Sequence, residues 1–221
     1  MKASPIAIEL MRAEYNGQVG QLLALGFHRK FHTLAKLNER ILALFFERLL
    51  RHFPNEPAAL RVVAVQAGKV VGTLSIKWKP ETELYSSTAQ SELLPWREFR
   101  MFGKWAVFKL LLGLYLLSYK PQAGECYIAD ISVHPNHQGK GIGKLLLGWA
   151  EHYARTQPFF KVLSLHVSSQ NPGAKRLYEQ LSFQTNRKER SLLNHVLFRE
   201  FEWEYMKNKL HNNEFPTKET L

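Results

Sequence analysis

One stretch of the chain has residue types and spacing that suit the binding of a phosphate. Residues 138–144 read QGKGIGK, after an apolar run at 127–133 and before apolar residues spaced as one face of a helix. The first turn of a helix presents backbone N–H groups without partners at the positive end of its dipole, and glycines let an anion approach them. Lys140 and Lys144 add positive charge. The pattern predicts a seat for a phosphate or diphosphate.

The spacing of this turn narrows the choice of ligand. It fits neither the P-loop nor the dinucleotide fingerprint, because Gln138 and Leu145 stand where a P-loop needs Gly and Ser or Thr. It fits Gln-x-x-Gly-x-Gly, as Gln138, Gly141 and Gly143, which resembles the acetyl-coenzyme A signature of the GNAT superfamily of N-acetyltransferases. The preceding DISVHP is also similar to that family. The alternative is a helix start that merely needs tight packing.

A second stretch, about 30 residues on, resembles the second GNAT motif. VLSLHV at 162–167 predicts a buried strand, and Asn171 then suits the N-cap of a helix with Pro172 at its first position. Tyr178 lies on the buried stripe of that helix. The family has Gly-Phe after the helix, whereas this chain has Ser182-Phe183. We therefore expect Ser182 to adopt a left-handed conformation at a cost of roughly 1 kcal/mol.

The resemblance implies direct acetyl transfer from acetyl-CoA to an amine. It implies a backbone N–H of the strand at Ile131–Val133 as donor to the thioester oxygen, and Tyr178 as proton donor to the leaving thiolate. A packed core aromatic is the alternative for Tyr178. The residues expected to hold acetyl-CoA are Ile131, Ser132, Val133, Gln138, Gly139, Lys140, Gly141, Ile142, Gly143, Lys144, Asn171 and Tyr178.

The base that deprotonates the amine stays open between two carboxylates, Glu125 and Asp130. Strand alternation places them on opposite faces unless a bulge intervenes. A structural or solvent-facing carboxylate is the alternative for each. His28 and His32 lie four residues apart but lack a third ligand and a HExxH pattern, so we predict no metal.

The periodicity predicts an α/β chain whose elements come in the order found at the front of a GNAT domain. The resemblance implies the GNAT fold, which is a central mixed, mostly antiparallel sheet flanked by helices, here with a helical insert before the cofactor strand. We expect a single domain over 1–207 and a polar tail at 208–221. The expected elements are a strand at 4–12, two helices within 18–52, a hairpin of 61–66 and 69–78, an insert at 79–121, a helix at 141–155, and two final strands within 183–207.

The insert is the part least like the family. Residues 93–119 are very apolar and predict a helix, which we expect to form a lid or wall of an apolar acceptor pocket. The run from Trp105 to Tyr119 is about 15 residues, against about 20 for a membrane span, and contains Lys109. We therefore predict no transmembrane segment. A buried helix is expected, with an interfacial or homodimer-forming helix as the alternative.

Composition bounds the remaining choices. The chain has 221 residues, a formal net charge of +11 and one cysteine, Cys126, which we expect to be packed in a strand. The start shows no signal-peptide pattern, so we expect a cytoplasmic protein. The basic residues are spread along the chain, and no nucleic-acid partner is expected. Two alternatives to an acetyl-CoA-dependent enzyme remain. One is an enzyme that uses a longer acyl-CoA, and the other is a GNAT-fold sensor or interaction module that binds acyl-CoA without turnover.

Overall fold

The computed structural model describes residues 4–35, 37–53, 58–80, 95–190 and 202–210. Seven strands form one sheet in the order β1-β2-β3-β4-β5-β7-β6. All neighbours are antiparallel except β4 and β5, which are parallel. The strands are β1 (Ile6–Leu10), β2 (Ala59–Gln66), β3 (Lys69–Trp78), β4 (Glu125–Val133), β5 (Val162–Ser168), β6 (Gln184–Arg190) and β7 (Glu202–Lys209). This confirms the predicted mixed, mostly antiparallel sheet.

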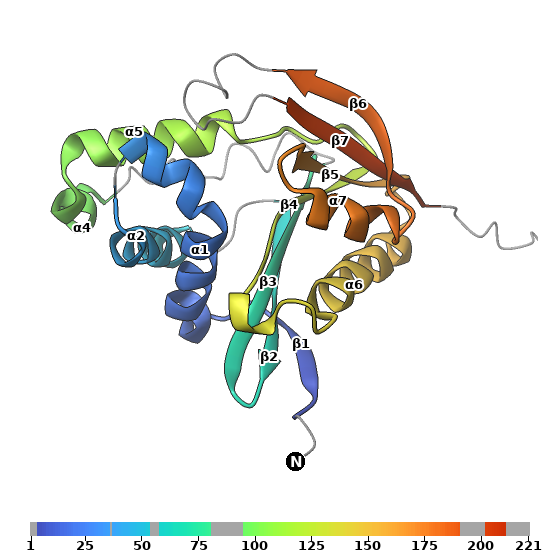
Figure 1. Ribbon diagram of the computed structural model, residues 1–221, viewed down its shortest axis with the longest axis horizontal. Coiled ribbons are helices and arrows are strands. Elements are labelled where there is room, and N and C mark those ends of the chain that lie inside the picture. The colour runs from blue at the N-terminus through green and yellow to red at the C-terminus, as the bar shows by residue number, and fades with distance from the viewer. Residues whose placement is uncertain (1–3, 36, 54–57, 81–94, 191–201, 211–221) are drawn as a thin grey trace, which may run out of the picture.

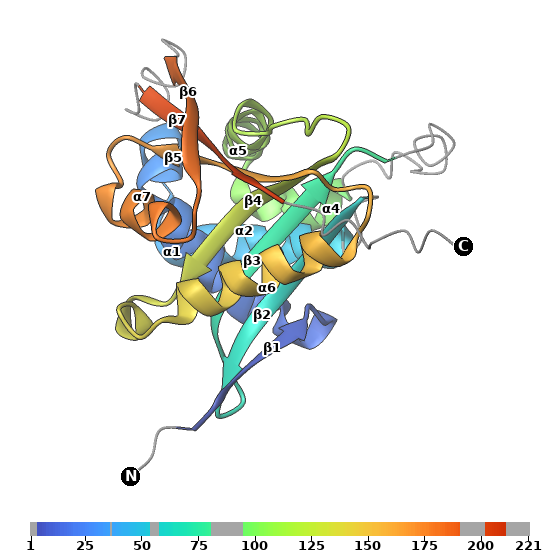
Figure 2. The ribbon, with the colours of Figure 1, turned by 90° about the vertical axis from the view of Figure 1, so that its right-hand side faces the viewer.

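Helices cover both faces of the sheet (Figure 1). On one side lie the N-terminal pair and the helices of the insert, and on the other lie α6 and α7. The helices are α1 (Asn16–Ala35), α2 (Glu39–His52), α4 (Trp96–Phe99), α5 (Lys104–Leu116), α6 (Ile142–Thr156) and α7 (Pro172–Glu179). Figure 2 shows α6 lying across β2, β3 and β4.

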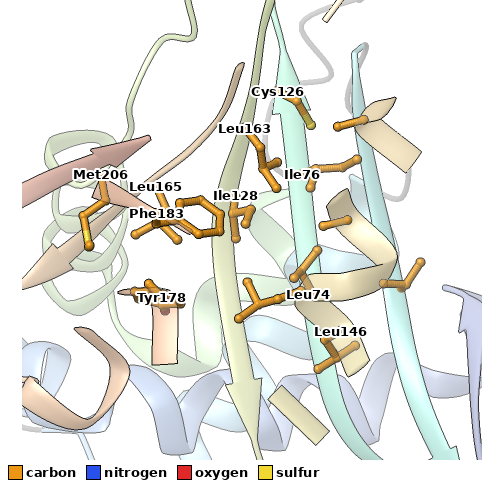
Figure 3. Packing of buried hydrophobic residues seen from close by; sticks show 14 of the residues in the cluster. Leu74, Ile76, Cys126, Ile128, Leu146, Leu163, Leu165, Tyr178, Phe183 and Met206 are labelled. Atoms are coloured by element: carbon orange, nitrogen blue, oxygen red, sulfur yellow. The ribbon is translucent and has the colours of Figure 1, made fainter. Parts of the chain in front are cut away.

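Two apolar cores follow from this layering. The first packs α6 and α7 on the sheet around fully buried residues such as Leu74, Leu146 and Leu163, several of which Figure 3 shows. The second joins α1, α2 and α5 around Phe31, Phe45 and Leu110. The buried face of α5 therefore belongs to the core of the N-terminal helices.

Most predicted elements are confirmed within a few residues, and one is wrong in detail. The predicted continuous helix of 93–119 is interrupted at Gly103, whose φ of 79° lies in the left-handed region and separates the 3-10 turn Arg100–Phe102 from α5. Parts of the predicted insert, final strands and tail lie outside the described residues, at 81–94, 191–201 and 211–221.

A fork in the sheet positions the site. β4 and β5 pair only from Glu125–Ile128 to Val162–Leu165, and then part. Beyond the fork, β5 continues against β7, while β4 continues against β3. The register of β3 and β4 shifts between Ser75 and Ile76, which pair with Asp130 and Ile128, so that Ala129 is the extra residue of a β-bulge.

Candidate functional site

The predicted phosphate turn lies at the start of α6. Gly141 is the N-cap of that helix with φ 81°, and Gly139 has φ 75°. A Cβ built on either residue would meet no heavy atom within 4 Å. The left-handed backbone thus faces open space that a side chain would partly fill, as expected of a cradle for an anion.

The amides of this turn are available to a ligand. The first backbone hydrogen bond of α6 joins Leu145 N to Gly141 O at 3.1 Å, and no described backbone oxygen accepts from the amides of residues 139–144. Two side chains of the turn stabilise it by hydrogen bonds to the preceding backbone. Gln138 Nε2 donates to Val133 O at 3.1 Å, and Lys140 Nζ donates to Asn136 O at 2.8 Å. The turn therefore fits a diphosphate.

Gly143 has a different role from its two neighbours in the motif. A Cβ there would lie 3.1 Å from Leu177 Cδ2 of α7. That approach is tighter than ordinary van der Waals contact, so this glycine allows α6 and α7 to pack closely. The packing alternative considered from the sequence thus describes Gly143, whereas Gly139 and Gly141 have no such neighbour.

The fork leaves one edge of β4 open beside this turn. No strand of the described residues pairs with Ala129–Val133 on the β5 side. An unpaired edge offers backbone donors and acceptors to an extended ligand that carries amides. Ser132 has an additional contact, because its Oγ donates to Leu22 O of α1 at 2.9 Å. The edge and the glycine turn are continuous along the chain, so one extended ligand with a diphosphate could contact both.

The two residues of the second motif lie on the α6 and α7 side. Asn171 is the N-cap of α7, and its Oδ1 accepts from Ala174 N at 3.1 Å, as the sequence predicted. Tyr178 is 6% exposed and lies in the first core, where its ring centroid is 6.0 Å from that of Phe183 (Figure 3). Burial raises the pKa of Tyr178 to about 12, so the phenol keeps its proton at neutral pH.

The bulge changes where the two predicted carboxylates lie. The bulge that the sequence left open as an exception is present, and its extra residue Ala129 reverses the alternation between Glu125 and Asp130. Both side chains lie on the face opposite α6. Asp130 contacts Arg61 of β2, whereas Glu125 contacts Tyr205 of β7.

In the described part of the chain, hydrogen-bond donors already engage the oxygens of both carboxylates, which leaves none of them open to an amine substrate. Asp130 forms a bidentate ion pair with Arg61, with both N–O distances at 2.7 Å and side chains 14% and 17% exposed. Glu125 is 3% exposed and accepts hydrogen bonds from Ser164 Oγ, Tyr205 Oη, Tyr119 Oη and the Gln122 amide. Carboxylates whose oxygens are all engaged by donors in this way hold neighbouring elements together.

An aromatic cluster lies beside Glu125, and the sequence analysis did not find it. It consists of Tyr119, Tyr127, His166 and Tyr205. The ring centroids are 4.5 Å apart for Tyr119 and Tyr127, 5.0 Å for Tyr119 and His166, and 4.9 Å for His166 and Tyr205. These rings come from the insert, β4, β5 and β7, and meet on the sheet face opposite α6. Tyr127 precedes the last paired residue of β4 at the fork.

His166 connects this cluster to a more exposed carboxylate. Its Nδ1 lies 3.0 Å from Tyr127 Oη, and its Nε2 lies 3.4 Å from Glu189 Oε1 on β6. Burial lowers the pKa of His166 and outweighs the opposing effect of Glu189, so the imidazole is neutral at pH 7. We assign the proton to Nε2, because Tyr127 then donates to Nδ1 and Nε2–H points to Glu189.

One signal for the cluster was present in the sequence. In VLSLHVS, Ser164, His166 and Ser168 alternate with Leu163, Leu165 and Val167, which marks two different faces of β5. The apolar character of the run as a whole predicts a uniformly buried strand and hides this alternation. Tyr119, Glu189 and Tyr205 carried no comparable local signal, since only the sheet order brings them to His166.

The remaining predicted features fall outside the site. Cys126 is fully buried and its pKa is raised to about 12 by burial, which confirms a packed strand residue. A pocket of about 520 Å³, which the sequence did not predict, lies at the opposite end of β4 from the glycine turn and is lined by residues that include Glu125, Trp78 and Phe160. No three potential metal-ligating side chains gather among the described residues, and the side chain of His32 is not among those described.

The chain belongs to the acetyltransferase (GNAT) family, whose sequence model matches residues 30–183. The predicted family is thereby confirmed. Among curated relatives, a mycothiol acetyltransferase of Rhodococcus opacus is 28% identical over 148 residues, which are 62% of this chain and 45% of that protein. The N-acetyltransferase YycN of Bacillus subtilis is 32% identical over 48% of this chain and 72% of its own length. The chain thus spans about half the length of the mycothiol acetyltransferase that it matches.

Solved structures agree on the fold. The Salmonella typhimurium protein yncA, solved with its cofactor acetyl-CoA, has a TM-score of 0.57 at 17% identity and covers 97% of this chain and 99% of its own. The spermidine N-acetyltransferase of Vibrio cholerae, in complex with CoA and spermine, has a TM-score of 0.58 at 17% identity, covering 94% and 96%. The family and the names of these relatives support an acetyltransferase enzyme.

Proposed function

We propose that this protein transfers an acetyl group from acetyl-CoA directly to the nitrogen of an amine. The observation that carries the proposal is the open edge of β4 beside the free amides of the glycine turn. The diphosphate of acetyl-CoA would bind the turn at residues 138–144 through the amides of residues 139–144, since the amide of Gln138 donates to Pro135 O at 3.2 Å. The pantetheine amides would pair with Ile131–Val133. The donor substrate supplies the thioester, and the chain supplies its position.

The two faces of the sheet divide the proton transfers between them. We assign to Tyr178, on the α6 and α7 side, the donation of a proton to the departing thiolate, since burial keeps its phenol protonated at neutral pH. We assign the binding of the amine to the aromatic cluster on the opposite side. One N–H bond of the amine breaks as its nitrogen bonds to the acetyl carbon, and we assign the released proton to His166, either directly or through the hydroxyl of Tyr127.

This assignment replaces the two carboxylates considered from the sequence. Both carboxylates already accept hydrogen bonds, so we assign them structural roles. Asp130 holds β4 to β2 through Arg61. Glu125 holds Tyr119 and Tyr205 in the cluster. Glu189, whose side chain is 39% exposed, lies beyond His166 and links it to solvent. The outward path of the proton is therefore Tyr127, His166 and Glu189.

The first experiment separates an enzyme from a sensor. Release of free thiol from acetyl-CoA is measured with a panel of amines that includes spermidine, spermine, amino sugars, amino acids and peptide N-termini, and acyl donors of greater length are run in parallel. Amine-dependent thiol release supports the proposal and ranks acceptors. Tight binding of acetyl-CoA with no amine-dependent release over the whole panel would favour the sensor instead.

The second experiment tests the seat of the diphosphate. Gly141→Ala places a methyl group in the open space of the turn and strains a left-handed residue, so we expect CoA to bind at least about tenfold more weakly. Pantetheine lacks the diphosphate and should bind both proteins equally. Gly148→Ala is the matched control, since a Cβ there also meets no atom but lies mid-helix in α6. Equal loss of CoA and pantetheine affinity would place the diphosphate elsewhere.

We further propose that residues 1–207 form one catalytic domain with the insert at 79–121, and that the protein acts in the cytoplasm. The interlocked helices of the second core, which unite α1, α2 and α5, support the first statement. The single, fully buried cysteine is compatible with a reducing compartment. Among the described residues, no helix combines the length and apolar character needed to cross a bilayer.

A further inference from the structure

Helix α5 carries an exposed apolar stripe that packs against nothing in the described chain. Trp105, Phe108, Leu112 and Tyr115 are 77%, 57%, 36% and 73% exposed. Their spacing of three, seven and ten residues from Trp105 puts them on one side of the helix. The opposite side, with Val107 and Leu110, is buried in the core formed with α1 and α2. Figure 1 shows α5 at the periphery of the molecule.

Positive charge borders this stripe. At 100° per residue, Lys104 and Lys109 fall on either side of the four apolar residues, and both are exposed. The sequence from Arg100 to Gly124 contains four basic residues and no Asp or Glu. Just before α5 in the chain, Trp96 and Met101 are also 40% and 57% exposed. The α5 face, as we name Trp105, Phe108, Leu112 and Tyr115 with Lys104 and Lys109, is thus apolar along its middle and cationic along both edges.

This arrangement matches one class of partner. Trp and Tyr prefer the boundary between lipid headgroups and acyl chains, where the apolar part of the ring is buried and its polar group stays hydrated. Lysines beside such a stripe can reach anionic headgroups. A helix of 13 residues is about 20 Å long, which is too short to span a bilayer but suits lying in the plane of its surface.

The charges disfavour the other occupant considered for this face. If two copies of the chain met through their α5 faces, the lysines at the edges of both stripes would be brought together with no acidic residue of the same segment to pair with them. Like charges in such an interface repel, whereas anionic headgroups neutralise them. Charge complementarity therefore selects a negatively charged lipid surface over a second copy.

We propose that the α5 face binds this protein to the surface of anionic phospholipid membranes. The helix would lie in the membrane plane with Trp105 and Phe108 among the acyl chains and the two lysines among the headgroups. The chain leaves α5 through Leu117 and reaches Tyr119, which belongs to the aromatic cluster at the fork. Membrane binding would therefore bring the acceptor side of the candidate site close to the lipid surface.

Sedimentation of the full chain with lipid vesicles tests this inference. One set of vesicles is phosphatidylcholine alone, and the other contains phosphatidylglycerol as well. We expect partition into the anionic vesicles to exceed partition into the neutral ones by at least about tenfold at low salt, and to fall as salt screens the lysines. Equal partition into both kinds of vesicle, or none into either, would overturn the proposal.

Two variants tie the binding to the α5 face. Trp105→Ser with Phe108→Ser should lower partition at least about tenfold, because both exposed rings are removed from the stripe. Lys104→Gln with Lys109→Gln should remove most of the preference for anionic lipid while keeping the stripe. The matched controls are Leu10→Ser, which removes a 57% exposed apolar residue elsewhere, and Lys69→Gln with Lys161→Gln, which removes two exposed charges elsewhere.

The controls should bind vesicles as the unaltered chain does, and all variants should keep its circular dichroism spectrum and affinity for CoA. Unchanged vesicle binding by both α5 variants would contradict the inference. The molar mass in lipid-free solution supplies the remaining outcome. A dimer that becomes monomeric in the Trp105→Ser, Phe108→Ser chain would identify the α5 face as a dimer interface and sink the lipid proposal.

Discussion

The hydroxyl of Tyr127 lies 3.0 Å from Nδ1 of His166, next to the point where β4 and β5 part. Where the two parallel strands separate, backbone groups of β4 are left without strand partners among the described residues. The side chains of Tyr127 and His166 lie next to this point, on the sheet face opposite α6. On the other face, Tyr178 belongs to the same apolar core as Ile128, the last paired residue of β4. A thioester held at the fork would therefore have a neutral imidazole on one side and a protonated phenol on the other.

Replacing His166 by Gln should slow acetyl transfer by about 10² to 10³-fold at pH 7, because a positioned base contributes on that scale. The imidazole must be neutral to accept a proton, and burial holds its pKa below 6.5. We expect the kcat/KM of the unaltered enzyme to fall only below pH 6.5, and the variant to lack that acid limb. Steady-state thiol release over a range of pH measures both quantities.

The pH dependence of folding stability gives an independent check on the pKa of His166. Since the pKa of His166 is lower in the folded state than in the unfolded chain, the unfolded state binds more protons between those two values. Folding stability should therefore fall as the pH falls through 6.5 toward the folded-state pKa, and less so in His166→Gln. Retention of the acid limb in the rate profile of the variant would show that another group is the base.

Tyr178→Phe should lower kcat while leaving the affinity for CoA nearly unchanged. The substitution keeps the ring that packs against Phe183 but removes the proton, and we expect a loss of about 10² in kcat. Thiol release and calorimetric titration with CoA measure the two effects separately. Full activity in this variant would leave Tyr178 with the packing role that its 6% exposure also permits.

The glycine turn and the capped helix could be predicted because their chemistry is local. Gly139, Gly141 and Gln138 act within one turn, and Asn171 caps the helix that it precedes, so sequence spacing alone contains the geometry. The conformation of Ser182 could also be predicted from the local sequence. Its predicted left-handed conformation is present, with φ 64°, because the chain must reverse between α7 and β6 whatever residue stands there.

The aromatic cluster could not be predicted because it is a product of sheet order. His166 lies opposite Tyr205 because β7 pairs with β5 and separates β5 from β6. It lies near Tyr127 because β4 and β5 are still paired at Tyr127, just before the fork. The bulge at Ala129 is a similar case, since no residue type in Glu125–Val133 marks it. Its consequence is large, because one extra residue moves Asp130 onto the face of Glu125.

The Arg61–Asp130 pair should be structural rather than catalytic. Asp130→Asn leaves the guanidinium of Arg61 partly buried without its carboxylate, so we expect a loss of about 2 to 3 kcal/mol in the free energy of unfolding. The kcat should stay within about threefold of the unaltered enzyme. Denaturant unfolding and thiol release on the same samples give both numbers.

A double-mutant cycle sharpens this prediction. Arg61→Met combined with Asp130→Asn should cost less stability than the sum of the two single changes, because the second change removes a group already left without its partner. Additive losses would argue against a coupled pair. A fall of 10² or more in kcat for Asp130→Asn, with stability unaffected, would restore this carboxylate as a candidate base.

Ser182→Gly should stabilise the protein by about 0.5 to 1 kcal/mol, because glycine adopts a φ of 64° without the steric cost that serine bears. For a domain of this size the midpoint of thermal unfolding should rise by about 1 to 4 °C. The turn itself should persist, since the Phe183 amide donates to Tyr178 O at 3.1 Å through backbone atoms alone. Ser182→Ala is the matched control: it retains a Cβ and should show no such gain. A lower midpoint for the glycine variant would mean that the serine side chain stabilises the turn by more than its backbone strain costs.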